Sequence, residues 1–398
     1  GADRAVERQM SAVPDPTPGL PSGESIDPTP APRPAADIAL EGRHVRLVHL
    51  DPAAHLDSLY EASHGAGRDA LWQYLGSVPF PDKAAFAAHL QKQASSADPF
   101  FLAILDRESG EAVGHAAYMR IEPAHRVIEV GNVLFTPRLQ RSPAASEAIY
   151  LMARHAFEGM GYRRFEWKCN DLNAPSRRAA HRYGFTYEGT FRQHMIVKGR
   201  SRDTAWYAML DGEWPARRRA FETWLAPENF DAEGRQRLAL SALNATAIPG
   251  FPMRRAGPAD AAAYDAIHRA AYVWNREMLG REPVPLLTPT LEILSTYETW
   301  LLEKDGAIAG TAALAPNPDH LEIWSLSVDP AQQNAGIGRT LLDAAEARAR
   351  ALGLSTLKLF TGKPLQKNID WYHRRGYATD REEELPDGRI LVHMSKTI

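Results

Sequence analysis

Several features are scarce or missing in this chain of 398 residues, and each shortage excludes a class of protein. Cys169 is the single cysteine, so no internal disulfide can form, which fits a reducing cytoplasm. There is no run of 18 apolar residues to cross a membrane and no apolar segment typical of a secretory signal near the start. The formal net charge of −3 gives no basic excess for nucleic acid or an anionic membrane. We therefore expect a cytoplasmic protein with neither partner.

Metal chemistry is also not indicated. The chain has 14 histidines, but none shows the spacing to another histidine or to the cysteine that is typical of a metal site. Hydrophobic content of 44% and charged content of 24% are ordinary for a globular protein. The length suggests two or three domains. We expect no metal.

Proline is concentrated at the start of the chain. Residues 1–37 contain eight of the 29 prolines and almost no apolar periodicity. Such a composition predicts an extended, disordered leader. Prolines, glycines and asparagines in 227–250 indicate a connector, with a short helix around 235–243. The remaining chain then divides into domains at 38–226 and 251–398.

One stretch occurs twice, about 190 residues apart. Counting from Glu129 or from Glu322, proline recurs at +8, glutamine at +11 and a small residue at +16. An amphipathic helix follows each copy. Since this period is far too long for a solenoid, the repeat predicts two copies of one domain type.

The order of expected elements is the same in both halves. The first half has strands near 44–48, 100–105, 112–121 and 165–169, helices at 52–63, 145–160 and 174–183, and a closing hairpin with its turn at 198–203. The second has strands at 253–255, 299–303, 307–314, 321–328 and 355–360, helices at 258–272, 338–352 and 367–375, and a final hairpin through 386–388. Cys169 alternates with Trp167 and Phe165, so it is expected in the core.

The second copy carries a glycine-rich loop between a strand and a helix. Gly336 and Gly338 have no Cβ, so the backbone can curl and direct several N–H groups to one point. The helix that follows adds the positive end of its dipole. Together these favour a pyrophosphate site. No Gly-Lys-Ser/Thr follows, which excludes a Walker loop, and a third glycine for a dinucleotide fingerprint is missing.

This loop, Gln333-x-x-Gly336-x-Gly338, together with Tyr372 four residues before Gly376, resembles the GNAT superfamily of acetyl-CoA-dependent N-acetyltransferases. The resemblance covers about 251–398. It implies an α/β (α+β) fold, here two tandem GNAT domains, each with a mixed, mostly antiparallel twisted sheet flanked by helices. It also implies acetyl-CoA as cofactor and a primary amine of a small molecule or peptide as acceptor.

The first domain is similar to the Rim-type branch of the same superfamily, which includes N-terminal acetyltransferases of ribosomal proteins. The similarity rests on Glu129-Val-Gly131, Asn173-Ala-Pro-Ser176 and Lys198-Gly-Arg-Ser-Arg-Asp203, among other segments. One departure is Pro143, which stands at the position of the loop glycine. Because proline has no N–H, at least one phosphate hydrogen bond is lost there, unless Arg141 or Ser142 compensates.

The resemblance assigns roles in the second domain. Glu322 would be the general base, directly or through water, and Tyr372 would protonate the leaving thiolate. The backbone near Leu326 would hold the thioester carbonyl. Further cofactor contacts are expected from Ser327, Val328, Gln333, Asn334, Ala335, Gly336, Ile337, Gly338, Arg339 and Asn368.

In the first domain Glu129 would be the base and Ser176 the acid, since Ala180 occupies the tyrosine position. Ser176 is more typical of a helix start than of an acid, and a glutamate within a strand is more often on a solvated face. Cofactor contacts are expected from Val133, Phe135, Gln140, Arg141, Ser142, Ala144, Ala145 and Asn173. The basic run Arg217–Arg219 is expected on an exposed helix surface or beside the 3′-phosphate of CoA.

Two classes of function stay open. In one, the chain is an N-acetyltransferase that acts by direct attack in a ternary complex, with the second domain as catalyst. In the other, the first domain is a non-catalytic substrate-recognition or pseudo-dimer partner, or the whole chain is a CoA-responsive binding protein. The sequence does not specify the acceptor or the oligomeric state, although a tandem can mimic a homodimer.

Overall fold

The computed structural model describes residues 23–304, 306–333 and 335–398. In this part of the chain the strands form an eight-stranded sheet in the order β1-β2-β3-β4-β5-β6-β8-β7 and a seven-stranded sheet in the order β14-β15-β13-β12-β11-β10-β9. Neighbours run antiparallel except for one parallel pair in each sheet, β5–β6 and β12–β13. This is the expected mixed, mostly antiparallel architecture in two copies.

The first sheet is made of strands β1 (Ala39–Glu41), β2 (Val45–His49), β3 (Phe100–Asp106), β4 (Ala112–Glu122), β5 (Val127–Phe135), β6 (Arg164–Asn170), β7 (Thr186–Val197) and β8 (Arg200–Leu210). Its helical segments are α1 (Pro52–Ser63), η1 (Asp69–Trp72), α2 (Lys83–Ala94), α3 (Pro143–Arg154), the π-helix η2 (His155–Gly159) and α4 (Ala174–Arg182). Asp51 accepts a hydrogen bond from the Ala53 N–H and caps α1, as its Asp-Pro start predicts.

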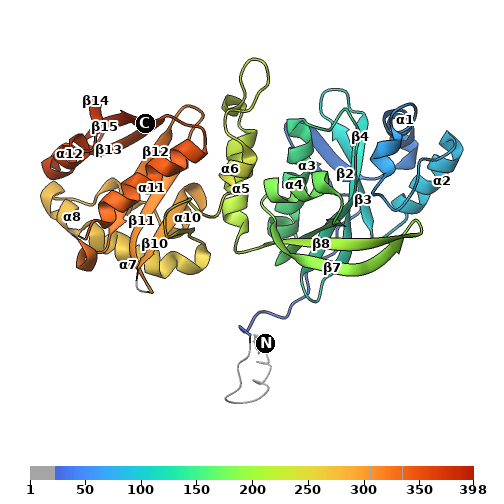
Figure 1. The fold of residues 1–398 in the computed structure, drawn as a ribbon, viewed down its shortest axis with the longest axis horizontal. Coiled ribbons are helices and arrows are strands. Elements are labelled where there is room, and N and C mark those ends of the chain that lie inside the picture. The colour runs from blue at the N-terminus through green and yellow to red at the C-terminus, as the bar shows by residue number, and fades with distance from the viewer. Residues whose placement is uncertain (1–22, 305, 334) are drawn as a thin grey trace, which may run out of the picture.

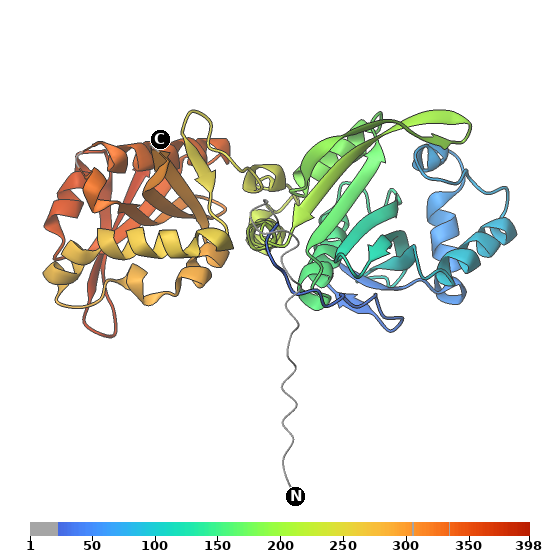
Figure 2. The same ribbon diagram turned by 90° about the horizontal axis from the view of Figure 1, so that it is seen from below.

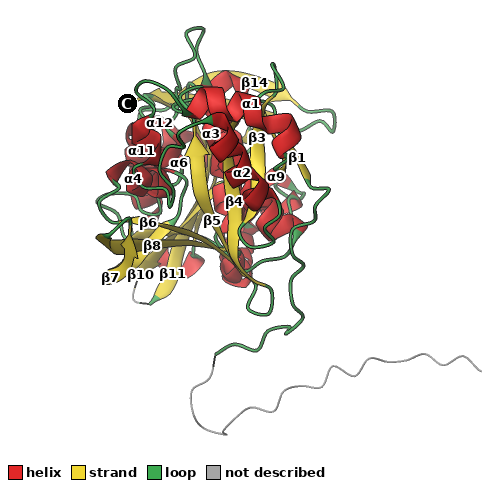
Figure 3. Cartoon of the chain, turned by 90° about the vertical axis from the view of Figure 1, so that its right-hand side faces the viewer, coloured by secondary structure: helices red, strands yellow, loops and turns green. Residues whose placement is uncertain are grey.

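The second sheet is made of β9 (Met253–Arg255), β10 (Glu298–Lys304), β11 (Ala307–Pro316), β12 (Leu321–Val328), β13 (Thr356–Gly362), β14 (Ala378–Glu384) and β15 (Ile390–Thr397). Its helical segments are η4 (Pro258–Asp260), α7 (Ala261–Ala271), α8 (Val273–Leu279), α9 (Val284–Leu287), α10 (Thr290–Thr296), η5 (Pro330–Gln332), α11 (Ile337–Ala351) and α12 (Gln366–His373). Helix α11 packs in the core that contains Ile323, and α7 packs in the separate cluster that contains Trp324. Figure 3 colours the helices and strands of the chain, with the first domain in front.

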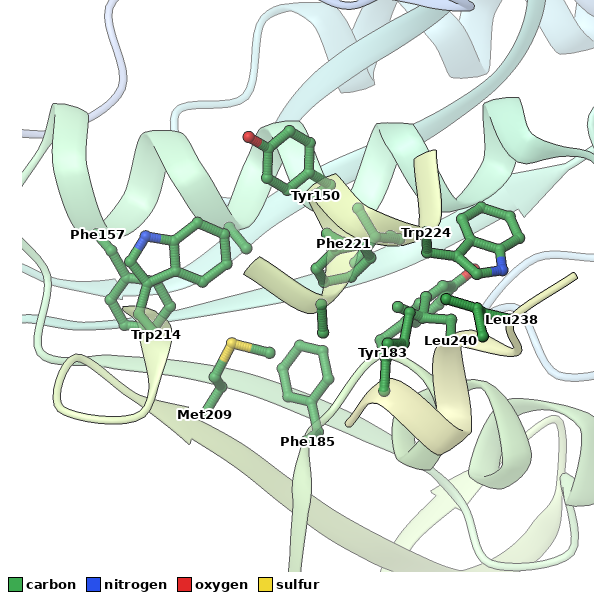
Figure 4. Close-up of a cluster of buried hydrophobic side chains, with 14 of the residues drawn as sticks. Tyr150, Phe157, Tyr183, Phe185, Met209, Trp214, Phe221, Trp224, Leu238 and Leu240 are labelled. Carbon is green, nitrogen blue, oxygen red and sulfur yellow. The ribbon is translucent and has the colours of Figure 1, made fainter. Parts of the chain in front are cut away.

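Between the two sheets lie α5 (Trp214–Leu225), η3 (Pro227–Asn229) and α6 (Leu240–Leu243), as two views at right angles show (Figures 1 and 2). The aromatic face of α5 is buried: Trp214, Phe221 and Trp224 pack with Tyr150 and Tyr183 of the first domain (Figure 4). Burying one such ring stabilises the fold by a few kcal/mol. The helix after β8 therefore belongs to the first domain's core while its other face meets α10.

A bulge in β12 changes which of its side chains face each side of the second sheet. Ala313 of β11 faces Ser325, and the next residue, Leu314, faces Ile323, so Trp324 is the extra residue. Ile323 before the bulge and Leu326 after it lie in the same core with α11, whereas Trp324 belongs to the cluster on the α7 side. A bulge shifts the alternation of side chains by one position.

Several sequence predictions need correction. The short helices α8 to α10 were not anticipated, and residues 235–239 are not helical because the connector helix begins only at Leu240. The turn of the first closing hairpin is confined to Lys198 and Gly199, since β8 already begins at Arg200. The turn expected between β10 and β11 includes Asp305, which lies outside the described residues.

The leader also differs from expectation over part of its length. Residues 1–22 lie outside the described part. The Ala31 N–H donates to the Pro123 carbonyl at 3.0 Å, Arg126 Nε to the Thr29 carbonyl at 2.9 Å, and Tyr162 Oη to the Pro32 carbonyl at 3.1 Å. The disorder expected of residues 1–37 therefore does not extend to this stretch, because its carbonyls find donors on the first domain. Among the described helices, none is long and apolar enough to span a membrane.

Candidate functional site

The central feature of the second domain is a gap between two parallel strands. β12 and β13 pair only at Leu321–Ile323 with Leu357–Leu359, and they diverge from the bulge at Trp324 onward. A cavity of about 1190 Å³ opens there, lined by residues 323–326 and 328 of β12 and by residues 360–365 at the end of β13. A cavity of this size can take a large cofactor. The splay thus turns an unpaired strand edge into the wall of a binding site.

The glycine loop and the start of α11 form another wall of this cavity. Gly336 caps α11 with φ of +81°, a left-handed conformation that glycine adopts at little cost. Gly336, Ile337, Gly338 and Arg339 all line the cavity. The first N–H groups of this 15-residue helix therefore lie at the cavity, where they and the helix dipole favour an anionic group.

Most of the charged side chains in the described lining are basic. Seven lining residues are lysine or arginine, and one, Asp370, is a carboxylate. The basic residues are Arg281, Arg339, Lys363, Lys367, Arg374, Arg375 and Arg389. Asp370 accepts a hydrogen bond from Gln366 Nε2 at 2.7 Å. Such a balance suits a ligand with several phosphates.

Two tyrosines lie close together at the cavity. Tyr272 Oη lies 3.3 Å from Ser325 Oγ, and burial raises the pKa of Tyr272 to about 12. Burial also raises the pKa of the Tyr372 phenol well above its usual value, with a further contribution from Tyr272. Tyr372 is therefore protonated at neutral pH. A protonated phenol at the cavity is available as a proton donor to a leaving group.

Glu322 lies one residue before the cavity wall. It is half-buried on β12 and is not among the lining residues, which begin at Ile323. Its carboxylate is close enough to Tyr297 to raise the pKa of that phenol, although burial is the larger cause. Tyr297 in turn stacks on Trp324 at 4.3 Å between ring centroids. A base role for Glu322 would thus require a bridging water or a side-chain movement.

The structure brings together most of the cofactor residues expected in the second domain. Those that line the cavity are Leu326, Val328, Gln333, Gly336, Ile337, Gly338, Arg339 and Asn368. Ser327 is 1% exposed and its hydroxyl lies 2.9 Å from His268 Nδ1, so it faces α7 instead. Ala335 is exposed beside the loop, and Asn334 lies outside the described residues.

Sequence reasoning missed the wall contributed by α8 and α9. Tyr272, Trp274, Asn275, Arg281 and the prolines near Val284 line the cavity from this side. Trp274 lies under Lys367 Nζ, 5.2 Å from the ring centroid. The one available signal was the density of aromatic residues in Tyr272-Val-Trp274, which also fits an ordinary core helix.

The first-domain loop has a different geometry. Ser142 is the N-cap of α3 and Pro143 is its first residue, a position that tolerates proline because its N–H has no partner within the helix. The left-handed residue is Arg141, with φ of +58°, and Ser142 Oγ donates to the Leu139 carbonyl at 2.6 Å. Gln140 Nε2 donates to the Phe135 carbonyl at 2.8 Å. These polar groups satisfy one another within the loop.

Glu129 is buried, contrary to the expectation of a solvated face. It is 4% exposed, and its Oε2 accepts from Lys168 Nζ at 3.0 Å. Lys168 also bonds Glu166 at 2.5 Å and lies 3.7 Å from the centre of the Trp206 ring. Burial raises the pKa of Glu129, and Lys168 acts in the opposite direction. The candidate base is therefore one member of a buried ion-pair chain.

The remaining first-domain candidates have identifiable structural partners. Ser176 Oγ accepts from the Trp167 indole N–H at 3.0 Å, and its own N–H donates to Asn173 Oδ1, the N-cap of α4. Val133, Phe135 and Ala144 pack against the core, and Ala145 is buried. Cys169 is buried, as expected. These contacts account for the side chains without a ligand.

The basic run on α5 is a correction. Arg217 is 6% exposed, and its NH1 donates to the Asn244 carbonyl at 2.8 Å. Arg219 NH1 donates to the Leu294 carbonyl at the end of α10, at 3.2 Å. Only Arg218 is exposed. The expectation of an exposed surface fails because carbonyls of the connector and the second domain accept these guanidinium N–H groups.

Known proteins resemble both halves of the chain. Residues 264–377 match the family model described as "Acetyltransferase (GNAT) family", and residues 44–186 match the one described as "Acetyltransferase (GNAT) domain". A GCN5-related N-acetyltransferase from Brucella melitensis has a solved structure that is 47% identical, with a TM-score of 0.53, over 54% of this chain and 97% of that chain. A probable acetyltransferase (GNAT family) from Chromobacterium violaceum ATCC 12472 is 39% identical, with a TM-score of 0.46, over 50% and 100% of the two chains.

A curated relative, the amino-acid acetyltransferase of Azotobacter vinelandii, is 40% identical over 95 residues. That match covers 23% of this chain and 21% of the relative, so the chain spans about a fifth of the length of the curated relatives it matches. The nearly complete match to the Brucella structure and the two separate family matches point to the same family. The chain belongs to the GNAT acetyltransferases and carries two GNAT domains.

Proposed function

We propose that the second domain transfers an acetyl group from acetyl-CoA to a primary amine by direct attack in a ternary complex. GNAT acetyltransferases generally use acetyl-CoA. The observation that carries the proposal is the cavity between β12 and β13, which meets the N-terminus of α11 at Gly336. The edge of β12 and the N-terminus of α11, which favours anions, lie in one cavity, as a long ligand with a phosphorylated end requires.

The residues present fit acetyl-CoA. Backbone N–H groups of the loop and of the start of α11, from Gln333 to Arg339, would hold the pyrophosphate. The strand edge at Leu326–Val328, which β13 leaves unpaired, would bond the pantetheine arm, and Asn368 would hold the arm from α12. When bound, acetyl-CoA supplies an activated thioester.

Two side chains would handle the protons. The amine nitrogen bonds to the carbonyl carbon as the carbon–sulfur bond breaks, so the amine must lose one proton and the sulfur must gain one. Tyr372 would give its phenolic proton to the sulfur as the carbon–sulfur bond breaks. Glu322 would receive the amine proton through a water, since its carboxylate lies just outside the cavity wall. The backbone near Leu326 would donate to the developing oxyanion.

The first domain is better suited to a supporting role. Glu129 already accepts a hydrogen bond from Lys168, and the Arg141–Pro143 loop bonds internally. Arg219 of α5 contacts α10, so the first domain also buttresses the second. We infer that it acts as a built-in partner domain. Its similarity to the Rim-type branch stays a prediction.

Calorimetric titration of acetyl-CoA into the intact chain tests the proposal. We expect one site, and we expect Gly336→Val to raise the Kd at least about tenfold, because a β-branched residue in the left-handed region costs 1–2 kcal/mol or more. Gly353→Val is the matched control: Gly353 has φ of +76°, has open space around its Cβ position and lies at the far end of α11. Absence of any acetyl-CoA binding would refute the proposal. A stoichiometry of two would refute the assignment of catalysis to the second domain alone.

A further inference from the structure

Arg281 and Arg389 meet at one part of the cavity, apart from the α11 N-terminus. Arg281 follows α8, and its NH1 donates to the Asp387 carbonyl at 3.1 Å. Arg389 immediately precedes β15, and its Nε donates to Asp387 Oδ2 at 2.6 Å. Both arginines line the cavity. Asp387 gives its carboxylate to Arg389 and only its backbone carbonyl to Arg281, so these contacts supply one negative charge for two guanidinium groups.

Arg389 also has a donor without a partner. Its NH1 is buried and makes no hydrogen bond, while Nε and NH2 bond Asp387. The side chain as a whole is 18% exposed. A buried N–H of a charged group is costly to leave unpaired. A shift of the Arg389 side chain toward the cavity would let a ligand there accept this hydrogen bond and remove that cost.

The position of this pair separates it from the cofactor's phosphates. Arg339 lies in α11, and Arg374 and Arg375 follow α12, so these three lie with the glycine loop. Arg281 instead follows α8, whose Leu279 packs 3.1 Å from the Cβ position of Gly362, and Arg389 lies beside Gly362 through the pair Gly362–Leu391. Two further cations line the cavity: Lys363 is paired with Glu382 at 2.7 Å, and Lys367 Nζ lies over the Trp274 ring, 5.2 Å from its centroid.

We propose that Arg389, supported by Arg281, binds the carboxylate of the acceptor, so that the second domain acetylates a small amine that also carries a carboxylate. This inference rests on the proposed acetyl transfer. A guanidinium group matches the geometry of a carboxylate and bonds it strongly. The same positive charge disfavours polyamines and other polycations, because the described lining offers them a single carboxylate, Asp370.

The test compares acceptors in pairs that differ by the carboxylate. CoA thiol release is measured with the intact chain, acetyl-CoA and each of the twenty L-amino acids, and with cadaverine, agmatine, 2-phenylethylamine and spermidine. The first three amines are decarboxylated lysine, arginine and phenylalanine. We expect turnover of at least one amino acid, and kcat/KM lower by about 10- to 100-fold for amines without the carboxylate, the range of a lost charge-assisted hydrogen bond.

Arg389→Gln provides the second measurement. We expect the KM of the accepted amino acid to rise by about 10- to 100-fold while the Kd for acetyl-CoA stays unchanged. Arg381→Gln is the control, since Arg381 lies on the same hairpin, is 58% exposed and pairs with Glu383. If Arg389→Gln does not fold, the comparison of amino acids with their decarboxylated amines, made with the unaltered chain, still tests the carboxylate assignment.

The outcomes separate the two proposals. Equal or better turnover of the decarboxylated amines, an unchanged KM in Arg389→Gln, or no turnover of any amino acid by a chain that binds acetyl-CoA would each overturn the carboxylate assignment alone. A chain that binds no acetyl-CoA would instead overturn the proposed function from which the assignment starts.

Discussion

Replacing Glu298 by glutamine should be among the most destabilising single changes in the second domain. Glu298 is 2% exposed at the start of β10, and its two oxygens accept from Arg348 Nε at 2.9 Å and Arg348 NH2 at 2.8 Å. Arg255 NH2 lies 3.3 Å from the same carboxylate. Both guanidinium groups lie over the faces of Trp300, at 4.6 and 5.6 Å from a ring centroid. The glutamine would leave these buried cations without a counter-charge.

The size of the effect follows from the pKa. Burial alone would raise the pKa of Glu298, but Arg255 and Arg348 outweigh it and lower the pKa from 4.5 to about 2. At 1.36 kcal/mol per unit, this difference corresponds to about 3 kcal/mol of stability at neutral pH. Breaking a buried pair by removing one partner typically costs about 3–5 kcal/mol. We therefore expect the free energy of unfolding to fall by about 3–5 kcal/mol.

The sign of the pH dependence is also fixed. Because the pKa is lower in the folded state, the contribution of Glu298 is fully present above about pH 4.5 and is lost as the pH falls toward 2. Urea unfolding followed by far-UV circular dichroism at pH 7 and at pH 3 measures both effects. The matched control is Glu303→Gln on the same strand, where the pair with Arg254 is about half-exposed and worth at most about 1 kcal/mol. A loss below about 1 kcal/mol for Glu298→Gln, or a loss equal to that of the control, would refute the reasoning.

Three further predictions concern the sites and the core. Tyr372→Phe should lower kcat by about 10²- to 10⁴-fold, as expected for loss of a general acid, and should leave the Kd for acetyl-CoA unchanged. Steady-state kinetics and calorimetry measure the two quantities, and an unaltered kcat would contradict the prediction. Pro143→Gly should restore an N–H in the first-domain loop, yet calorimetry should detect no second acetyl-CoA site, because the loop's polar groups bond one another. A second site in the variant would mean that Pro143 alone prevents the first domain from binding acetyl-CoA. Trp224→Ala should lower the free energy of unfolding by about 3–5 kcal/mol, because it leaves a cavity in the aromatic cluster around α5. Phe191→Ala is the control and should lower it much less, since Phe191 is 52% exposed. Equal losses for the two variants in urea unfolding would contradict this prediction.

The fold could be predicted where hydrophobic period and turn residues agree. The boundaries of β12 were predicted correctly, because apolar and polar residues alternate between Asp319-His320 and Asp329-Pro330. Helix α11 was placed to within a residue or so at each end by its flanking glycines, Gly336 and Gly353. Helices α8 to α10 could not be predicted, because their four to seven residues are too few to show a helical period.

The site was harder to predict, because its side chains come from distant segments. The cofactor loop was recognised from local sequence, yet Arg281 and Arg389 are brought together only by the fold, with Asp387 between them. Glu298 could not be assigned a role from sequence, since Arg348 is 50 residues away. Arg217 was misplaced on the surface because its acceptor, the Asn244 carbonyl, lies in the connector.

The two copies of the repeat differ most in what surrounds their glutamates. In the first domain Lys168 Nζ bonds both Glu129 and Glu166 and lies against the Trp206 ring. The candidate base Glu129 is therefore already paired with a cation of the protein. Protonation of Glu129 would remove the negative charge that its Oε2 presents to the buried Lys168, which disfavours a base role there. In the second domain Glu322 is half-buried beside a cavity whose other walls are a helix N-terminus and two protonated tyrosines. The duplication has therefore left one site whose charges are satisfied by the protein itself and one whose charges call for a ligand, and this difference, more than the loss of a loop glycine, favours catalysis in the second domain.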